Sequence, residues 1–165
     1  MIESFQAFWA TPPANITATL CWSVIGLVIG SFLNVVIYRI PIMMQRETEN
    51  YLALENDQLP PHTERYNLIT PMSACTSCAH KLTPSDNIPV LSFVWLKARC
   101  RYCKARVSWR YPSVELLTAV LSALVIWHLG SGMAGLCGLI LVWMLIAMSF
   151  IDLDTQLLPD ELTLP

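Results

Sequence analysis

The sequence predicts a mainly α-helical, polytopic membrane protein with three transmembrane helices and a small, zinc-ribbon-like cytoplasmic domain. Three observations lead to this fold class: long uncharged apolar segments, the confinement of every Lys and Arg to one central stretch, and two Cys-x-x-Cys pairs inside that stretch. Hydrophobic residues make up 55% of the 165 residues and charged residues only 13%, about half the usual charged share. An ordinary water-soluble domain is therefore disfavoured.

The apolar segments define the expected spans. Residues 16–38 carry no charge, and a helix of this length, at ~1.5 Å per residue, crosses a ~30 Å hydrocarbon core. We predict transmembrane helices over residues 16–40, 113–129 and 133–151, the last two separated by a Gly-Ser-Gly turn. No basic residue precedes the first segment, so it lacks the n-region of a cleavable signal peptide. Pro41 is expected to end or kink the first helix.

The basic residues predict the orientation. All ten Lys and Arg lie between Arg39 and Arg110, against six acidic residues, which gives this stretch a net charge of +4. Because basic loops are retained in the cytoplasm, residues 41–112 are expected to form a cytoplasmic domain. Residues 1–15 are then a periplasmic N-terminus, and residues 152–165 an acidic segment that returns to the cytoplasmic side.

Small and polar residues within the spans predict helix contacts. Gly26 and Gly30 form a Gly-x-x-x-Gly pair, a spacing typical of closely packed membrane helices. Asn34 continues this stripe and is expected to hydrogen-bond to a neighbouring helix. Cys21 and Cys137 also lie within spans and are expected to be buried small apolar residues.

Four cysteines in the polar stretch predict a metal site. Cys75 and Cys78, and Cys100 and Cys103, form two Cys-x-x-Cys pairs separated by 21 residues. Two such turns together supply the four thiolates of a structural, tetrahedral Zn²⁺ site, which leaves no open position for water. Disulfides are disfavoured in a reducing cytoplasm, and a redox-active dithiol would not need a second matched pair. His62 and His80 are weaker alternative ligands.

Carboxylates follow the third span, at Asp152, Asp154 and Asp160. Asp152 is continuous with the apolar segment, so partial desolvation would suit it to general acid or base catalysis. The same residues could instead simply mark the boundary between lipid and water, and the sequence pattern leaves both interpretations open. Proteolysis by carboxylates also requires a second carboxylate close by.

Four motifs in order resemble the type IV prepilin leader peptidases of Gram-negative bacteria. They are, along the chain, Gly30-Ser-Phe-Leu-Asn-Val-Val-Ile-Tyr-Arg-Ile-Pro41, the two Cys-x-x-Cys pairs, Arg110-Tyr-Pro-Ser-Val-Glu-Leu116 and Ile151-Asp-Leu-Asp-Thr-Gln-Leu-Leu-Pro-Asp160. The resemblance implies an inner-membrane aspartic protease that removes the basic leader of prepilins and type II secretion pseudopilins at the cytoplasmic face. It also implies N-methylation of the new terminus with S-adenosylmethionine.

The resemblance assigns roles to particular residues. Asp152 corresponds to the family's first catalytic aspartate, the four cysteines to its zinc-binding tetrad, and Glu115 to its glutamate at the start of the second span. Near the start of a helix, a glutamate also has a purely structural use as a favourable first-turn charge. Membrane lipid and prepilins are the expected partners, and no nucleic-acid partner is expected.

The sequence also departs from the family. The family's second aspartate lies in a Gly-x-Gly-Asp motif that residues 1–165 do not contain, and Ala98 stands where the family commonly has glycine. We therefore expect the N-terminal portion of such an enzyme, inactive by itself, with residues 152–165 beginning a truncated peptidase domain. The alternatives are a noncatalytic zinc-binding membrane scaffold from a truncated gene and, more weakly, a membrane thiol oxidoreductase.

Overall fold

The computed structural model describes residues 15–155, and the account below is confined to them. The expected periplasmic N-terminus and most of the expected acidic segment, Asp160 included, lie outside these residues. The described part is mainly helical and contains no β-strand, which confirms the predicted fold class. Its long helices are α2 (Ile16–Glu55), α4 (Arg110–Leu129) and α5 (Met133–Thr155), and all three are long and apolar enough to cross a membrane.

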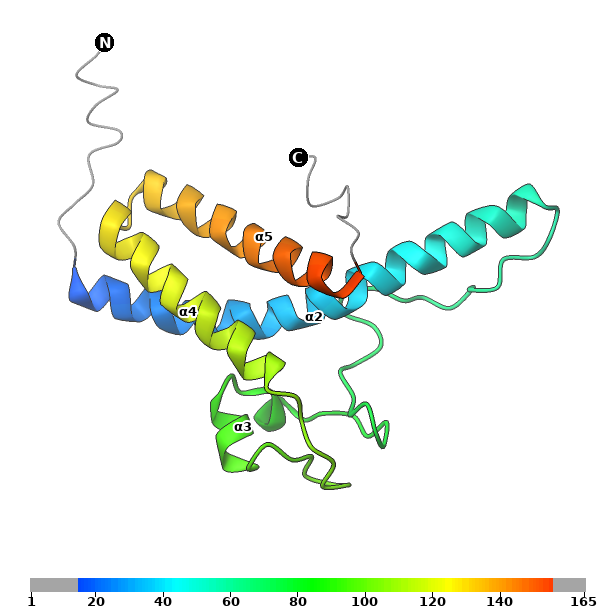
Figure 1. Cartoon of the computed structure of the whole chain (residues 1–165), viewed down its shortest axis with the longest axis horizontal. Coiled ribbons are helices and arrows are strands. Elements are labelled where there is room, and N and C mark those ends of the chain that lie inside the picture. Colours follow the sequence, from blue (N-terminus) through cyan, green and yellow to red (C-terminus); the bar gives the residue numbers. More distant parts are fainter. Residues whose placement is uncertain (1–14, 156–165) are drawn as a thin grey trace, which may run out of the picture.

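Helix α2 is longer than predicted. It begins after Asn15, whose side chain accepts a hydrogen bond from the Thr17 backbone N–H at 2.9 Å, an N-cap. It then passes through Pro41 and continues to Glu55, so of the two effects expected of Pro41 the helix does not show the first, an end at this position. Proline removes only one helical hydrogen bond, and the residues after it are mostly good helix formers. Figure 1 shows the axis of α2 changing direction in its middle part, between the blue and cyan portions.

The two glycines of α2 bring it close to α4, as predicted. A Cβ added at Gly26 would lie 2.9 Å from the Ala119 Cα, and one added at Gly30 would lie 2.7 Å from the Glu115 Cα. Real Cβ atoms essentially never approach other atoms so closely. The crossing of α2 and α4 therefore depends on the missing side chains at both positions.

Polar side chains inside the bundle join the helices. Asn34, one further turn along α2, donates from Nδ2 to the Tyr111 carbonyl of α4 at 3.1 Å, which confirms its expected interhelical bond. Ser122 of α4 is fully buried; its hydroxyl donates to the Thr118 carbonyl at 2.7 Å and accepts from Trp143 Nε1 of α5 at 2.9 Å. Side-chain hydrogen bonds thus join α4 to both α2 and α5, although the core itself is apolar. That core contains Leu33, Val36, Ile37, Val114, Ile146, Ala147 and Ile151.

Cys21 and Cys137 lie on the outer surface of the bundle, so the prediction that they are buried is wrong. The sequence gives a span but not which of its faces meets another helix. A small apolar thiol is equally stable facing lipid.

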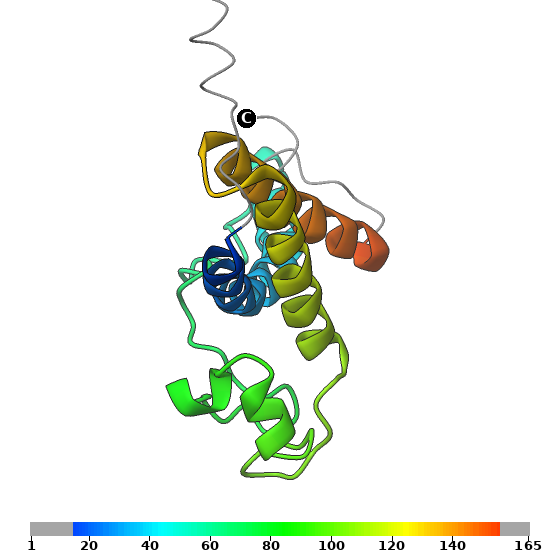
Figure 2. The ribbon, with the colours of Figure 1, turned by 90° about the vertical axis from the view of Figure 1, so that its left-hand side faces the viewer.

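The polar segment between α2 and α4 has little regular structure. It contains a 3-10 helix, η1 (Pro84–Asn87), a short helix, α3 (Leu91–Trp95), and two isolated antiparallel bridges. Figures 1 and 2 show this green segment to one side of the bundle, beside the beginning of α4. It joins the bundle at the end opposite the turn between α4 and α5.

The close crossing predicts the effect of one methyl group. Gly30→Ala is expected to destabilise the bundle by about 1–3 kcal/mol, because α2 and α4 must separate to accept the new Cβ. Gly132→Ala is the matched control, since nothing lies within 4 Å of a Cβ at that position. Thermal unfolding of both variants in detergent measures the difference, and equal midpoints would show that the glycine contact is not needed.

Candidate functional site

The two Cys-x-x-Cys segments fold into the same kind of turn. In the first, the Cys75 N–H donates to the His80 carbonyl at 2.9 Å, inside the bridge between Ala74 and Lys81. In the second, the Cys100 N–H donates to the Ala105 carbonyl at 2.8 Å, inside the bridge between Arg99 and Arg106. The residue after each second cysteine, Ala79 or Lys104, has a positive φ of 55° or 59°. The two turns, although far apart in the sequence, therefore have the same backbone geometry.

Together the two turns bring four sulfur atoms close to one point. The Sγ atoms of Cys75, Cys78, Cys100 and Cys103 all lie within 4.8 Å of one another. Cys75 Sγ and Cys103 Sγ, one from each turn, are 3.8 Å apart, and none of the four is in a disulfide. Four sulfurs around one tetrahedral Zn²⁺ at ~2.3 Å would lie about 3.8 Å apart. The donor set and its spacing fit that ion.

The turns also prepare the thiols for a cation. Backbone hydrogen bonds from Ser77 and Cys78 lower the pKa of Cys75 to about 6. The Ala105 N–H likewise lowers the pKa of Cys103, but desolvation and the neighbouring thiols outweigh it and raise that pKa to about 11. Four thiols placed this close cannot all ionise without a counter-charge, which is what a bound dication would provide.

The two histidines that the sequence offered as alternative ligands are used elsewhere. The Nε2 atom of His62 lies 2.6 Å from Glu49 Oε2 of α2, and the His80 ring stacks on Tyr102 with ring centroids 3.5 Å apart. The tetrad is therefore made of sulfur alone.

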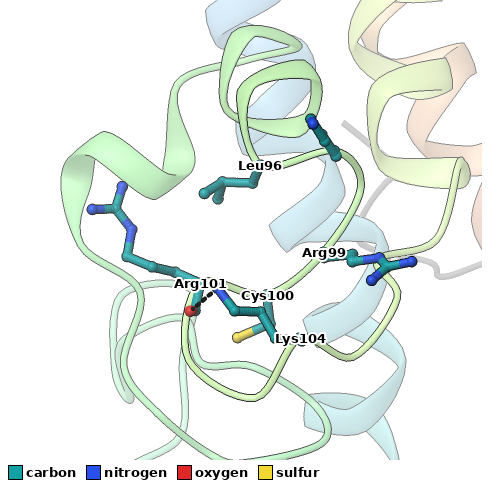
Figure 3. A pocket seen from close by; sticks show the side chains of 6 residues that line it. Leu96, Arg99, Cys100, Arg101 and Lys104 are labelled. Carbon is teal, nitrogen blue, oxygen red and sulfur yellow. Dashed lines mark hydrogen bonds between the residues drawn. The ribbon is translucent and has the colours of Figure 1, made fainter.

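Basic side chains surround the second turn. Figure 3 shows Leu96, Arg99, Arg101 and Lys104 around a small hollow beside Cys100, where Lys104 Nζ donates to the Arg101 carbonyl at 3.0 Å. Arg101 also pairs with Asp86 of η1 at 2.7 Å. A hydrogen bond from the Thr83 hydroxyl and the charge of Arg101 hold the pKa of Asp86 below its usual range. This pair fastens η1 to the second turn.

A cavity of about 670 Å³ separates the cysteine turns from the helices. Its walls include residues of both parts: Ser31, Asn34, Arg39, Cys75, Asp86 and Glu115. Glu115 is buried, and its Oε2 accepts a hydrogen bond from the Val90 N–H at 2.7 Å, just before α3. The expected role as a first-turn charge is wrong, because Glu115 lies in the second turn of α4. Its carboxylate instead ties the polar segment to α4.

Arg39 is a second tie that the sequence did not reveal. This arginine at the polar end of α2 is buried, and its guanidinium donates to the carbonyls of Asn67 at 2.8 Å and Pro71 at 2.5 Å. Carbonyl acceptors carry no sequence signature, since every residue has one. The one signal that could have found it is the charge of Arg39 directly after the apolar segment.

The carboxylates at the end of α5 lie in different surroundings. Arg110 of α4 forms a bidentate ion pair with Asp154, in which Nη1 lies 2.7 Å from Oδ1 and Nη2 contacts Oδ2. Asp152 is exposed, two residues earlier on the same helix. The pair brings the end of α5 to the beginning of α4, where the cysteine segment is attached. Asp152 and the cysteine tetrad therefore lie at the same end of the bundle.

The chain is similar to known proteins of one family. Residues 24–129 match the model of the bacterial peptidase A24 N-terminal domain. The chain is 54% identical over 144 residues to a protein of Aeromonas salmonicida, 48% over 150 residues to one of Pseudomonas aeruginosa and 46% over 146 residues to one of Neisseria gonorrhoeae. Each bears the name prepilin leader peptidase/N-methyltransferase.

These matches include 85–88% of this chain but 49–51% of each relative, so the chain spans about half the length of the curated relatives it matches. No solved structure matches it.

The tetrad predicts metal content. Purified protein is expected to hold about one zinc per chain, and Cys78→Ser is expected to lose it, because three sulfurs cannot complete the site. Cys137→Ser, outside the tetrad, is the matched control and should keep the metal. Elemental analysis measures both. Full zinc content in Cys78→Ser would contradict the site.

Backbone geometry predicts a stabilising substitution. Ala98 has a φ of 56°, a conformation that costs an ordinary residue about 1–2 kcal/mol and glycine almost nothing. Ala98→Gly is therefore expected to stabilise the cysteine segment by about 1 kcal/mol. Ala105→Gly is the matched control. Ala105 does not have a positive φ, so this change should instead destabilise the cysteine segment. Zinc release to a colorimetric chelator in rising denaturant compares the two, and the same sign for both would refute the argument.

Proposed function

Because the chain belongs to the family of bacterial peptidase A24 N-terminal domains, we propose that it supplies the membrane-anchored N-terminal portion of a prepilin leader peptidase and N-methyltransferase. The observation that carries the proposal is the agreement with relatives of that name along 85% or more of the chain. The substrates would be type IV prepilins or type II secretion pseudopilins. The enzyme would remove their basic leader.

Asp152 is the proposed catalytic residue of this portion. In carboxylate proteases two acids share a proton; one activates water as a base while the other protonates the leaving group. Asp152 is exposed at the polar end of α5, where a peptide and water can reach it. The Gly-x-Gly-Asp motif of the second aspartate does not occur in residues 1–165. These residues therefore supply one of the two carboxylates.

A structural Zn²⁺ is the proposed ligand of the cysteine tetrad. Four thiolates leave no open coordination position, so the ion would hold the two turns together rather than activate water. Both turns contribute to the wall of the cavity beside α2 and α4. The proposal also includes transfer of a methyl group from S-adenosylmethionine to the new N-terminus, in line with the relatives' name. No residue of this chain is assigned to that step.

The proposed location is the bacterial inner membrane, with the cysteine segment in the cytoplasm. Its support is the distribution of charge, since every Lys and Arg lies between Arg39 and Arg110. The placement of Asp152 at the same end of the bundle as that segment is consistent with cleavage at the cytoplasmic face.

A noncatalytic zinc-binding scaffold remains the second candidate, because the described residues would bind metal whether or not they cut a substrate. A thiol oxidoreductase is disfavoured by geometry, since all four thiols gather in one cluster instead of forming one exposed dithiol.

A chimera tests the proposal. Joining residues 1–165 to the remaining half of the Aeromonas salmonicida relative is expected to restore cleavage of a prepilin, as seen by a mobility shift on a gel. Residues 1–165 alone should cleave nothing, because one carboxylate cannot play both roles. Cleavage by residues 1–165 alone would refute the need for a second aspartate in another segment.

The catalytic role is then tested in the active chimera. Asp152→Asn is expected to lower cleavage by ~10²-fold or more without loss of zinc. Asp57→Asn is the matched control, since it makes the same chemical change at the far end of α2. An Asp152→Asn chimera as active as its parent would favour the scaffold, with catalysis supplied wholly by the relative's half.

A further inference from the structure

Helix α3 turns large apolar side chains outward. Leu91 and Val94 are each 66% exposed and Trp95 is 86% exposed. Their spacing of three and four residues places them on one face of the helix. None of the three is needed for the tetrad or the tie at Glu115. An apolar face of this kind on a small polar domain indicates a contact with something other than water.

Two contacts fix the depth of α3 relative to the membrane helices. The Phe93 ring of α3 meets the Trp109 ring edge to face, with centroids 4.8 Å apart, and Trp109 directly precedes the first residue of α4. The Glu115 carboxylate, in the second turn of α4, binds the Val90 N–H just before α3. Helix α3 is therefore held level with the first turns of a candidate membrane span.

The apolar face of α3 is not covered by other described residues. Figures 1 and 2 show α3 displaced to the side of the bundle, not over its end. Trp109 is itself 73% exposed. Tryptophan is enriched where a membrane meets water, because its ring is apolar and its N–H is polar.

Basic residues follow the apolar face directly. Lys97 and Arg99 come two and four residues after Trp95, and with Arg101 and Lys104 they line the hollow of Figure 3. Asp86, the nearby acid, is already paired with Arg101. Cations beside an apolar face are the pattern of segments that lie in the surface of an anionic bilayer.

We propose that α3 is an interfacial membrane anchor. Leu91, Val94 and Trp95 enter the boundary between headgroups and acyl chains, and Lys97 and Arg99 meet the phosphates of anionic lipids. The anchor would hold the cysteine domain against the leaflet in which α4 begins. The anchor proposal requires that the chain crosses a membrane, but it does not require the proposed catalysis. Each of the two proposals can therefore be wrong while the other is right.

Fluorescence quenching tests the anchor. Residues 1–165 are reconstituted in vesicles of phosphatidylcholine and phosphatidylglycerol, with or without bromine on the acyl chains. The emission of Trp95 is the difference between the parent and Trp95→Phe, which removes one of six tryptophans. We expect brominated lipid to lower that difference by about twofold or more and aqueous acrylamide to leave it nearly unchanged.

A control tryptophan shows what an aqueous position looks like. Leu59→Trp in the Trp95→Phe background places a ring at a site that is 92% exposed, beyond the end of α2. Its emission should respond to acrylamide and not to bromine. Equal zinc content in all variants shows that the cysteine segment remains folded.

Other outcomes overturn the proposal. Quenching of Trp95 by acrylamide alone would mean that α3 faces water. Protection from both quenchers would mean a protein contact, and its loss on dilution in lipid would identify that contact as a second copy of the chain. Lys97→Gln with Arg99→Gln should reduce bromine quenching only when phosphatidylglycerol is present. Equal bromine quenching of this variant and its parent would refute the proposed contact of Lys97 and Arg99 with anionic lipid.

Discussion

The close crossing of α2 and α4 at Gly26 and Gly30 is the constraint on which the rest of the structure depends. In lipid, helices gain little from apolar burial against each other, so direct backbone approach and interhelical hydrogen bonds must hold them together. The approach at Gly30 leaves no room for a Cβ beside Glu115. One turn further on, Asn34 reaches the Tyr111 carbonyl. The crossing thereby fixes where α4 begins and, through it, where the polar segment is attached.

The polar segment has no comparable packing of its own and is held by a few polar links. Cys100 is its one buried apolar side chain among the described residues, and its helices have no more than five residues. Two links attach it to the helices: Arg39 binds two carbonyls and Glu115 binds a backbone N–H. A third link, between Asp86 and Arg101, lies within the segment itself. A domain with so small a core needs another source of folding energy, and the proposed metal, bound by four thiolates, would supply it directly.

The three helices and the cysteine cluster were predictable from the sequence, whereas polar partners far apart in the sequence were not. Uncharged length predicted the three helices, and cysteine spacing predicted the cluster, because both signals are local. Whether α2 ends at Pro41 or passes through it was left open by the sequence, since the cost of proline in a helix competes with the favourable residues that follow it. Arg110 and Asp154 are 44 residues apart, and nothing in either neighbourhood marks the other as its partner. The outward position of Cys137 depends on helix rotation, which a uniformly apolar segment does not encode.

The ion pair of Arg110 and Asp154 also limits how the proposed catalysis can work. Side chains two residues apart on a helix point about 160° away from each other, so Asp152 and Asp154 cannot share a proton from the same helix. Asp154 is in any case engaged by both nitrogens of the Arg110 fork, which contact both of its carboxylate oxygens. The partner of Asp152 must therefore come from another segment. Arg110 and Asp154 hold the last turn of α5 against α4. In the proposed enzyme this contact would fix the orientation in which Asp152 meets that partner.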